Sequence, residues 1–431
     1  MNLTDLPNEI LIKIFEYCKV LPLTHVSQKF NLIISNSSIL MQKFYLVITE
    51  KTRCDEITKS ERKHQKVLFK YNYKIDNSVL QVFNKYSEIK HVEFMRCILL
   101  ESTFIEILKA SPNIKQLAVF STYLKSDLIA SDSGTVIDSY QLRELNFRNS
   151  DQKILYLIKC SMSTILKMNI SLPHQYPVST IVDFLKRHDK IEEIENLTVS
   201  EIENTIMTQI LCEMKNLKKL SLEAESIKIE SIRNLNIENT SIHHLNLYGR
   251  TDPMDLNLIM SFFKNLKFLE LEVNSNLDSI NFVHLQRIGK RIEQLKIKNC
   301  SGEFFNHITL PNLKCFEIAD VTLNIMIEDW INFARRNQRL EVLKIKDETV
   351  SNENFITICQ EFMNLKELEL FYDPQRLTTD ILNYICSDLF PRNIKTLKIC
   401  KRNRQQYSFF TLTNDHKNFL KNNVSFHLIL R

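Results

Sequence analysis

The side chains in this sequence with the clearest chemical potential are lysines, glutamates and aromatic residues that recur at one position of a short repeated pattern. The charges alternate in blocks along the chain: Glu270 and Glu272, Lys296 and Lys298, Glu317, Lys344 and Lys346, Glu367 and Glu369, and Lys398. Aromatic side chains beside charge are typical of anchors in protein interfaces. We therefore predict a surface that binds a target protein, formed by Tyr248, Phe268, Lys296, Lys298, Lys344, Lys346, Phe371 and Lys398. The competing interpretation is a solvated charged surface without a partner.

Residues typical of catalysis or metal binding are present, but their spacing suits neither role. His243 and His244 form the only adjacent pair among 11 histidines, and on a strand they would face opposite sides of the sheet. Cys315 and Cys400 fall at outward positions, and nothing nearby in the sequence marks either thiol as reactive. The four glycines are too far apart for a phosphate-binding loop. We therefore expect no catalytic, cofactor-binding or metal-binding residue, no cofactor and no enzymatic activity.

The elements that must position these side chains follow from a pattern of the form apolar-x-x-apolar-x-apolar. It begins at Ile89, Ile114, Leu142, Ile165, Ile194, Leu217, Ile242, Leu266, Ile292, Leu313, Leu340, Leu365 and Ile394. The 13 units follow one another at intervals of 21 to 29 residues. Each unit predicts a strand, because alternate residues of a strand face opposite sides. Leu368 and Leu370 would point inward while Glu367 and Glu369 point outward, and the stretches between the strands are expected to contain helices.

This pattern resembles that of leucine-rich-repeat proteins, whose period of about 20–29 residues it shares. The resemblance implies an α/β repeat fold, a horseshoe-shaped solenoid with parallel strands on the concave face and helices on the convex face. It also implies that a target protein binds the concave face. Weaker matches at Met41 and His64, and an apolar run at Val424–Leu430, predict further strands at both ends of the array.

Polar residues at fixed positions predict how the turns are built. Asn precedes the strand in six units, at Asn113, Asn216, Asn265, Asn312, Asn364 and Asn393. Because Asn tolerates the left-handed conformation, we expect it to end the helices in place of Gly. The Asn or Cys that the family places three residues after the last strand leucine occurs only as Cys97, Asn274 and Cys300, which predicts an incomplete ladder of buried polar side chains.

Residues 6–40 have a different character from the repeats and predict two or three short helices. Pro7 suits the first turn of a helix, and Asp5 before it is the expected N-cap. Apolar residues follow at helical spacing, at Ile10, Leu11, Ile14, Phe15 and Cys18, and then at Leu21, Leu23, Val26, Phe30, Ile33 and Ile34. So few residues cannot bury all of these side chains against one another, so some apolar surface should face a partner.

The same residues resemble an F-box, a small helical module that docks on the Skp adaptor of a cullin ubiquitin ligase. The resemblance implies an adaptor-binding set of Leu6, Pro7, Ile10, Leu11, Ile14, Phe15, Val26, Phe30 and Ile33. The link between the two halves of the motif is about three residues shorter than is common, and Phe30 and Leu40 stand where the family often has Trp. The chain is thus expected to divide into an F-box at residues 1–43 and a leucine-rich-repeat domain at residues 44–431.

Composition narrows the class of protein. The 56 basic and 51 acidic residues give a formal charge of +5, which is too even to predict binding to nucleic acid or a membrane surface. Ten scattered cysteines form no disulfide or zinc pattern and favour an intracellular location, either cytoplasmic or nuclear. The start of the chain does not have the features of a signal peptide, and no apolar run is long enough to span a bilayer.

The hypothesis favoured by the sequence is a substrate receptor of an SCF-type (Skp–cullin–F-box) ubiquitin ligase. It would bind the Skp adaptor through the F-box and a target protein through the repeats, and the chemistry would belong to its partners. The alternative is a leucine-rich-repeat scaffold or inhibitor without a ubiquitin role, in which the N-terminal helices only cap the solenoid. An enzyme is a third and weaker hypothesis, because no active-site pattern is present.

Overall fold

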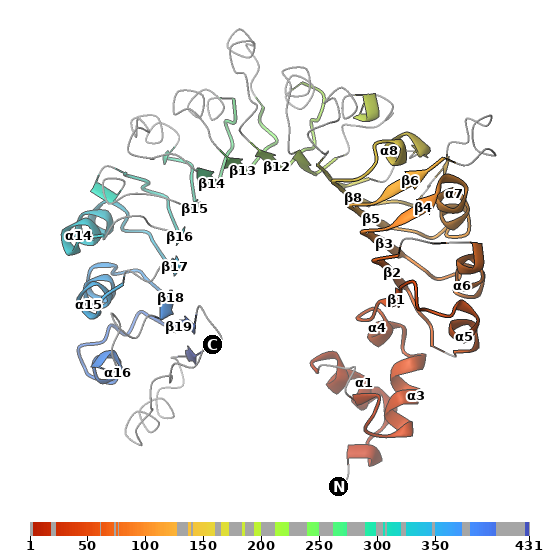
Figure 1. Cartoon of the computed structure of the whole chain (residues 1–431). Coiled ribbons are helices and arrows are strands. Elements are labelled where there is room, and N and C mark those ends of the chain that lie inside the picture. Colours follow the sequence, from red (N-terminus) through yellow and green to blue (C-terminus); the bar gives the residue numbers. More distant parts are fainter. Residues whose placement is uncertain are drawn as a thin grey trace. The chain divides into compact units, whose positions relative to one another are not determined.

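Short parallel strands, one for each repeat, recur along the described part of the chain, and helices connect several of them (Figure 1). The structure is a computed structural model of residues 1–431. It describes residues 3–18, 23–60, 62–72, 75, 77–126, 137–138, 141–159, 165–171, 183–185, 194–199, 212–223, 239–249, 262–273, 289–298, 305–306, 308–319, 325–346, 350–372, 380–401 and 427–430. The chain divides into two units, which are described separately: unit 1 is Met1–Ser200 with Glu213–Leu217, and unit 2 is Glu201–Cys212 with Lys218–Arg431.

Unit 1 begins with a helical module. It contains a 3₁₀ turn and three helices: η1 (Leu3–Asp5), α1 (Asn8–Glu16), α3 (Gln28–Asn36) and α4 (Ser38–Met41). Ser27 and Ser37 cap α3 and α4, because their hydroxyl oxygens accept hydrogen bonds from the backbone N–H groups of Phe30 and Leu40. The prediction that Asp5 caps the first helix is wrong. Pro7 occupies the N-cap of α1, and Asp5 lies in the preceding 3₁₀ turn.

The rest of unit 1 alternates strands with short helices. The strands of its sheet follow in the order β1 (Leu46–Ile48), β2 (Lys66–Lys70), β3 (His91–Met95), β5 (Gln116–Phe120), β8 (Glu144–Arg148), β10 (Lys167–Ser171) and β11 (Asn196–Val199). Between them lie α5 (Cys54–Lys59), η2 (Asn77–Val79), α6 (Leu80–Lys85), α7 (Glu101–Lys109) and α8 (Lys153–Leu157). Two small additional pairings join β4 (Ile98–Leu100) to β6 (Tyr123–Lys125) and β7 (Ile137–Asp138) to β9 (Ile158–Lys159).

Unit 2 continues the same arrangement. Its strands are β12 (Lys219–Glu223), β13 (His244–Gly249), β14 (Phe268–Val273), β15 (Gln294–Lys298), β16 (Cys315–Ala319), β17 (Val342–Lys346), β18 (Glu367–Tyr372), β19 (Thr396–Lys401) and β20 (His427–Leu430), each parallel to the next. The helices described in this unit are α14 (Ile327–Arg336), α15 (Asn352–Glu361) and α16 (Asp380–Ile385).

The strand predictions are confirmed at all 13 motifs, because a strand begins two residues into each of them. The strands predicted near Met41, His64 and Val424 are present as β1, β2 and β20. The inward side chains are buried under the helices. Phe94 of β3 packs 5.6 Å from Phe104 of α7, and Phe316 of β16 packs 5.0 Å from Phe333 of α14, measured between ring centroids. We call the opposite side of the strands the open face. Parallel strands and buried leucines in this register are the architecture of a leucine-rich repeat.

The Asn residues that recur before the strands have a different physical role from the one predicted. In the described residues, positive φ angles outside glycine belong to Tyr71, Arg96, Ser121 and Asn149, which directly follow strands. Five of the six predicted Asn residues instead donate from Nδ2 to a backbone carbonyl of the preceding repeat. The pairs are Asn113 to Ser87, Asn265 to Thr240, Asn312 to Lys290, Asn364 to Gln338 and Asn393 to Leu365, at 2.6–3.0 Å. These Asn side chains join neighbouring repeats rather than reversing the chain.

The prediction of an incomplete polar ladder is wrong for the four repeats of unit 1 from β2 to β8. Three residues after the last inward strand residue lie Asn72, Cys97, Thr122 and Ser150, and all four are buried. The Thr122 hydroxyl accepts a bond from the Cys97 N–H at 3.4 Å, and the Ser150 hydroxyl accepts one from the Thr122 N–H at 3.1 Å. Small hydroxyl groups therefore serve here as the family's Asn and Cys do. Asn274 and Cys300 lie outside the described residues.

Candidate protein-binding surfaces

The predicted target-binding lysines lie on the open face of unit 2, where they form one line with glutamates of neighbouring strands. The strand register places these residues side by side: Ser221, Asn246, Glu270, Lys296, Glu317, Lys344, Glu369 and Lys398. From Glu270 to Lys398 the sign of the charge changes at every strand. Since adjacent strands are about 4.8 Å apart, each charge has an opposite charge on either side of it.

Ion pairs follow from this alternation. The Nζ of Lys296 lies 2.5 Å from Glu270 and 3.7 Å from Glu317, and the Nζ of Lys346 lies 2.5 Å from Glu317. Lys398 binds Glu367 at 2.5 Å. Burial by itself would lower the pKa of Lys296, but the hydrogen bond and charge of Glu270 outweigh it and raise that pKa. Three of the five lysines predicted to contact a target are therefore already neutralised by their neighbours.

The other members of the predicted set are also on this face. The side chains of Tyr248, Phe268, Lys298, Lys344 and Phe371 are all half-buried, and no partner is present to test their role. Lys344 takes part in no ion pair within the part of the chain that the structure describes. The ring of Phe268 stacks on His244, with the ring centroids 3.7 Å apart. Part of this aromatic surface is therefore already covered by a neighbouring strand.

Two of the side chains considered for catalysis, His244 and Cys315, have environments that favour their neutral forms. Burial and the charge of Lys219 lower the pKa of His244 to about 4, although its bond to Asn246 and the charge of Glu270 act in the opposite direction. Burial raises the pKa of the Cys315 thiol. Cys400 lies on β19, and its side chain is outside the described set. Within the described residues, no group of three or more His, Cys, Asp or Glu is arranged to hold a metal ion, and no helix could cross a membrane.

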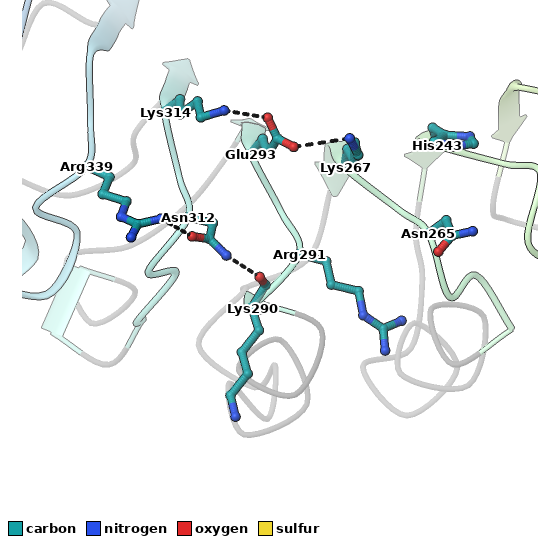
Figure 2. A pocket seen from close by; sticks show the side chains of 9 residues that line it. All are labelled: His243, Asn265, Lys267, Lys290, Arg291, Glu293, Asn312, Lys314 and Arg339. Carbon is teal, nitrogen blue, oxygen red and sulfur yellow. Dashed lines mark hydrogen bonds and ion pairs between the residues drawn. The ribbon is translucent and has the colours of Figure 1, made fainter.

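A second line of charges lies where the strands of unit 2 begin. We define the entrance row of unit 2 as Lys267, Glu293, Lys314, Glu341 and Lys366, the second residues of successive repeats. Each residue after Lys267 donates its backbone N–H to the carbonyl of the one before it, at 2.7–2.8 Å. Lys267, Glu293 and Lys314 of this row line a hollow of about 520 Å³, which Arg291 and Arg339 also line (Figure 2).

The entrance row of unit 2 again alternates in sign. Glu293 lies 3.4 Å from Lys267 and 2.9 Å from Lys314, and hydrogen bonds from both lysines hold its pKa below the usual value. Lys366 lies 2.8 Å from Glu341. The nearby Arg339 donates to the side chain of Asn312 at 2.7 Å. Several of the cations drawn in Figure 2 thus already bind side chains of neighbouring repeats.

In three consecutive repeats of unit 1 the equivalent position carries only positive charges, and Leu166 and Glu195 occupy it in the next two repeats. We define the entrance row of unit 1 as Lys90, Lys115, Arg143 and Leu166, which have the same backbone pairing at 2.7–2.9 Å. This row borders a hollow of about 770 Å³ between the strand entrances and α4. We call it the basic hollow, and its charged lining is Lys43, Lys66, Lys90, Lys115, Arg143, Lys167 and Glu144.

The basic hollow was not predicted from the sequence. The predicted binding residues all lie at outward positions within the strands, whereas the cations of this row precede the strands and are 25 to 28 residues apart in the sequence. The nearly even charge of the whole chain also concealed a local excess. The signal was nevertheless present, because Lys90, Lys115 and Arg143 all occupy the second position of the repeated motif.

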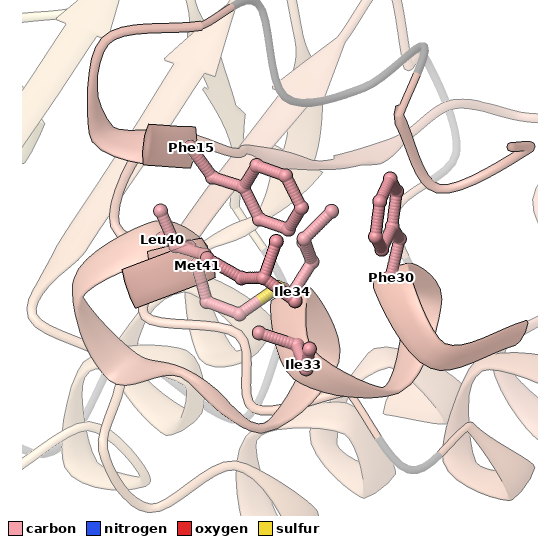
Figure 3. Packing of buried hydrophobic residues seen from close by; sticks show 7 residues of the cluster. Phe15, Phe30, Ile33, Ile34, Leu40 and Met41 are labelled. Atoms are coloured by element: carbon pink, nitrogen blue, oxygen red, sulfur yellow. The ribbon is translucent and has the colours of Figure 1, made fainter. Parts of the chain in front are cut away.

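The helical module has a hydrophobic core of its own. Its buried members are Leu11, Phe15, Phe30, Ile33, Ile34, Leu40 and Met41 (Figure 3). The rings of Phe15 and Phe30 meet edge to face with their centroids 4.9 Å apart. Lys29 joins the two halves of the predicted motif, because its Nζ donates to the carbonyls of Thr4 at 2.7 Å and Leu6 at 3.2 Å.

This core corrects part of the predicted adaptor-binding set. Leu11, Phe15, Phe30 and Ile33 are at most 7% exposed, so they hold the module together and leave no side-chain surface for a partner. Helical periodicity identified them as apolar and inward-facing but could not separate internal core from docking surface.

The remaining predicted residues are at the surface of the module. Leu6 and Ile14 are half-buried against the core, whereas Pro7 is exposed, Ile10 is 44% exposed and Val26 is 63% exposed. Further apolar side chains that sequence reasoning did not select are also exposed, namely Leu3, Tyr17, Leu32 and Ile39. A module with a complete core therefore still exposes several large apolar side chains to solvent.

Comparisons with known proteins find likeness only at the level of structure. No model of a known protein family matches the sequence. No curated protein matches it either. A leucine-rich-repeat-containing protein, LegL7 from Legionella pneumophila, is 13% identical with a TM-score of 0.40, covering 74% of this chain and 97% of its own.

Two other solved structures are similar over more of the chain. The leucine-rich-repeat protein LIC12759 from Leptospira interrogans is 12% identical with a TM-score of 0.37, covering 91% of this chain and 92% of its own. A yeast complex of Rad7 and Elc1 gives 11% identity and a TM-score of 0.39, covering 96% of this chain and 92% of the matched one. The leucine-rich-repeat architecture of this chain therefore rests on its own strand register and buried leucines.

Proposed function

We propose that this protein is the substrate-recognition subunit of an SCF-type ubiquitin ligase. Its helical module would bind the Skp adaptor, and its repeats would bind a target protein. The protein itself would carry out no chemistry. It would act by raising the local concentration of a target lysine near the conjugating enzyme, which its partners supply. Such a role belongs in the cytoplasm or the nucleus.

The observation that carries this proposal is the exposed apolar surface of a module whose core is already complete. Ile10 and Val26 expose 44% and 63% of their area, although seven other side chains of the module are buried. The F-box resemblance gives the adaptor as the partner that this surface would fit.

The adaptor contacts that we propose are the predicted residues that lie at the surface of the module. Pro7, Ile10 and Val26 would make the direct contacts, with Leu6 and Ile14 contributing from the margin. Leu11 and Phe15 would support the surface from beneath by fixing α1. A specific interface of this kind buries roughly 1,600 Å² in total, and a buried apolar anchor within it typically contributes about 2 kcal/mol or more.

Co-expression of the full chain with a Skp adaptor, followed by size-exclusion chromatography, tests the proposal. The native chain should co-elute with the adaptor, and the variant Ile10→Asp should not, because a desolvated carboxylate would replace an apolar anchor. Asn8→Asp is the matched control. It adds the same charge to the same helix about 200° around the axis, so the variant should still co-elute.

Circular dichroism must show that both variants are folded. Separate elution of a folded native chain would exclude adaptor binding and leave the helical module as a cap of the repeats. The protein would then be a free-standing scaffold, which is the second candidate function. The observation that favours that candidate is a hydrogen bond from the Lys63 N–H to the Ser35 carbonyl at 3.4 Å, which joins α3 to the residues before β2.

A further inference from the structure

The basic hollow of unit 1 has a charge that its own repeats do not neutralise. Six cations line it, and Glu144 is the one carboxylate among its described lining residues. That carboxylate is already engaged, since it accepts a hydrogen bond from the side chain of Gln116 at 3.0 Å. Gln116 in turn contacts Nδ1 of His91 at 2.6 Å, so this chain of polar groups ends within the strands rather than at a lysine.

The cations of the entrance row are held close together by the backbone. The N–H of Lys115 donates to the carbonyl of Lys90 at 2.7 Å, and the N–H of Arg143 donates to the carbonyl of Lys115 at 2.8 Å. Three positive residues therefore stand on adjacent strands, at a spacing of about 4.8 Å. A lysine or arginine can turn away from its neighbour, but the positions themselves cannot separate without loss of the sheet.

Most of these cations have no acidic partner. Lys115, Arg143 and Lys167 form no ion pair with any other residue that the structure describes, and Lys90 reaches only the side-chain oxygen of Gln65 at 3.5 Å. Lys66 lies 5.5 Å from the centre of the Tyr45 ring. In the entrance row of unit 2, Lys267, Lys314 and Lys366 each form an ion pair with a glutamate of a neighbouring repeat. The excess of positive charge in unit 1 is thus a local property of three consecutive repeats. An anion from outside the chain could neutralise it.

We propose that the basic hollow binds an extended, carboxylate-rich peptide segment of a protein partner. The four steps from Lys66 on β2 to Lys167 on β10 span about 19 Å, which is the length of about six residues of extended chain. Two apolar side chains border the same hollow, Ile39 on α4 at 52% exposure and Leu166 on the fourth repeat at 36%. A segment of aspartates and glutamates flanked by apolar residues matches both features.

The lining favours a peptide over a nucleic acid. Grooves that bind single-stranded nucleic acid combine positive charge with aromatic side chains on which the bases stack. Among the described residues that line this hollow, none is Phe, Tyr or Trp. The inference deepens the protein-binding role proposed above by naming the chemistry of the partner, but it does not depend on the adaptor.

Fluorescence anisotropy with the purified full chain tests the inference. The probe is a fluorescein-labelled peptide of eight residues, six aspartates or glutamates with a leucine at each end. The native chain should bind it, and binding should weaken as NaCl is raised from 50 to 300 mM. The double variant Lys115→Glu, Arg143→Glu should bind at least tenfold more weakly.

The control double variant is Lys51→Glu, Lys125→Glu, which makes the same change of charge at exposed residues of unit 1 outside the hollow. It should retain most of the native affinity. An equal loss in both variants would overturn the site, as would unchanged binding in the first variant. Tighter binding of a labelled oligouridine than of the peptide would overturn the choice of partner. The double variant Lys115→Glu, Arg143→Glu should still co-elute with the Skp adaptor. Failure of the peptide-binding inference can therefore be distinguished from failure of the F-box proposal.

Discussion

The two entrance rows occupy the same position of the repeated motif but differ in their charge. The row of unit 2 is neutralised by its own ion pairs, whereas the row of unit 1 is not. In unit 2, Lys267, Glu293 and Lys314 alternate in sign and form two ion pairs across three strands. In unit 1, Lys90, Lys115 and Arg143 carry one sign and have no acidic partner among the described residues. The backbone geometry of the two rows is nearly identical, so the difference comes from side-chain charge alone.

This difference shows how a repeat fold can separate stability from recognition. Stacked strands force any residue at a fixed motif position to lie beside its equivalents in the neighbouring repeats. Alternating charges then stabilise the array from within, whereas like charges leave a potential that a ligand can satisfy. Substitutions that change the charge pattern of one unit, or a property that only one unit should show, test this difference.

The largest effect is expected on the open face of unit 2, where charge alternation is most buried. Lys296→Met keeps the aliphatic stem but leaves Glu270, which is 8% exposed, without its cation. Because an unpaired buried carboxylate is costly, the variant should lose about 2–3 kcal/mol of stability, measured by urea unfolding. Lys366→Met breaks a pair whose members are 59% and 40% exposed, and it should lose less than about 1 kcal/mol. Equal losses would contradict the role of burial.

An acid-dependent loss of stability should originate in unit 1 at His64. Burial and the charge of Arg62 lower its pKa to about 4 from 6.5. Its ring meets that of Tyr86 edge to face, and its Nδ1 has no hydrogen-bond partner among the described residues. Because the unfolded chain binds the proton more tightly, this contribution is complete above pH 6.5 and is lost as pH falls toward 4. Between pH 7 and 5 the loss should be roughly 1–2 kcal/mol.

His64→Phe is the variant that tests this assignment, and His25→Phe, at an exposed position, is its control. Thermal unfolding followed between pH 7 and 5 should show a flatter profile only for the first. His244 in unit 2 has a similarly lowered pKa, so a residual slope should remain in His64→Phe. A slope identical to that of the native chain would show that His64 makes no contribution.

Reciprocal substitutions in the two entrance rows should give the smallest changes in stability. Arg143→Glu places a carboxylate between Lys115 and Lys167 and should change stability by no more than about 0.5 kcal/mol, because the site is exposed. Glu293→Lys gives unit 2 three like charges in a row and should lower the melting temperature by less than Lys296→Met does. The first variant should weaken binding of the acidic peptide, and the second should strengthen it. Movement of both affinities in the same direction would contradict the comparison.

Much of the fold could be predicted, because the repeated motif fixes both where each strand lies and which side of the sheet each of its side chains faces. Leu343 and Ile345, for example, are buried, while Lys344 and Lys346 on the same strand face outward. Partners across repeats could not be predicted in the same way. The bond between Asn364 and Gln338, or between Lys346 and Glu317, joins residues 26 to 29 positions apart, and only the stacking of repeats brings them together.

The candidate sites were predictable to different degrees. Apolar spacing identified the helical module but not the environment of each side chain. Leu11 lies in the core, whereas its neighbour Ile10 lies at the surface. Their separation depends on how α1 rotates against α3, which periodicity alone does not fix. The basic hollow was missed for a further reason, since charge was assessed over the whole chain and not at one position of successive repeats.

Lysine acetylation footprinting of the full chain, with and without a saturating acidic peptide, tests the contrast between the units most directly. The account predicts slower modification of Lys90, Lys115 and Lys167 when the peptide is present, with Lys267 and Lys314 unchanged. Mass spectrometry of the digested protein reads each lysine separately. Equal protection of the two entrance rows, or protection confined to unit 2, would contradict the claim that uncompensated charge in unit 1 creates the binding site.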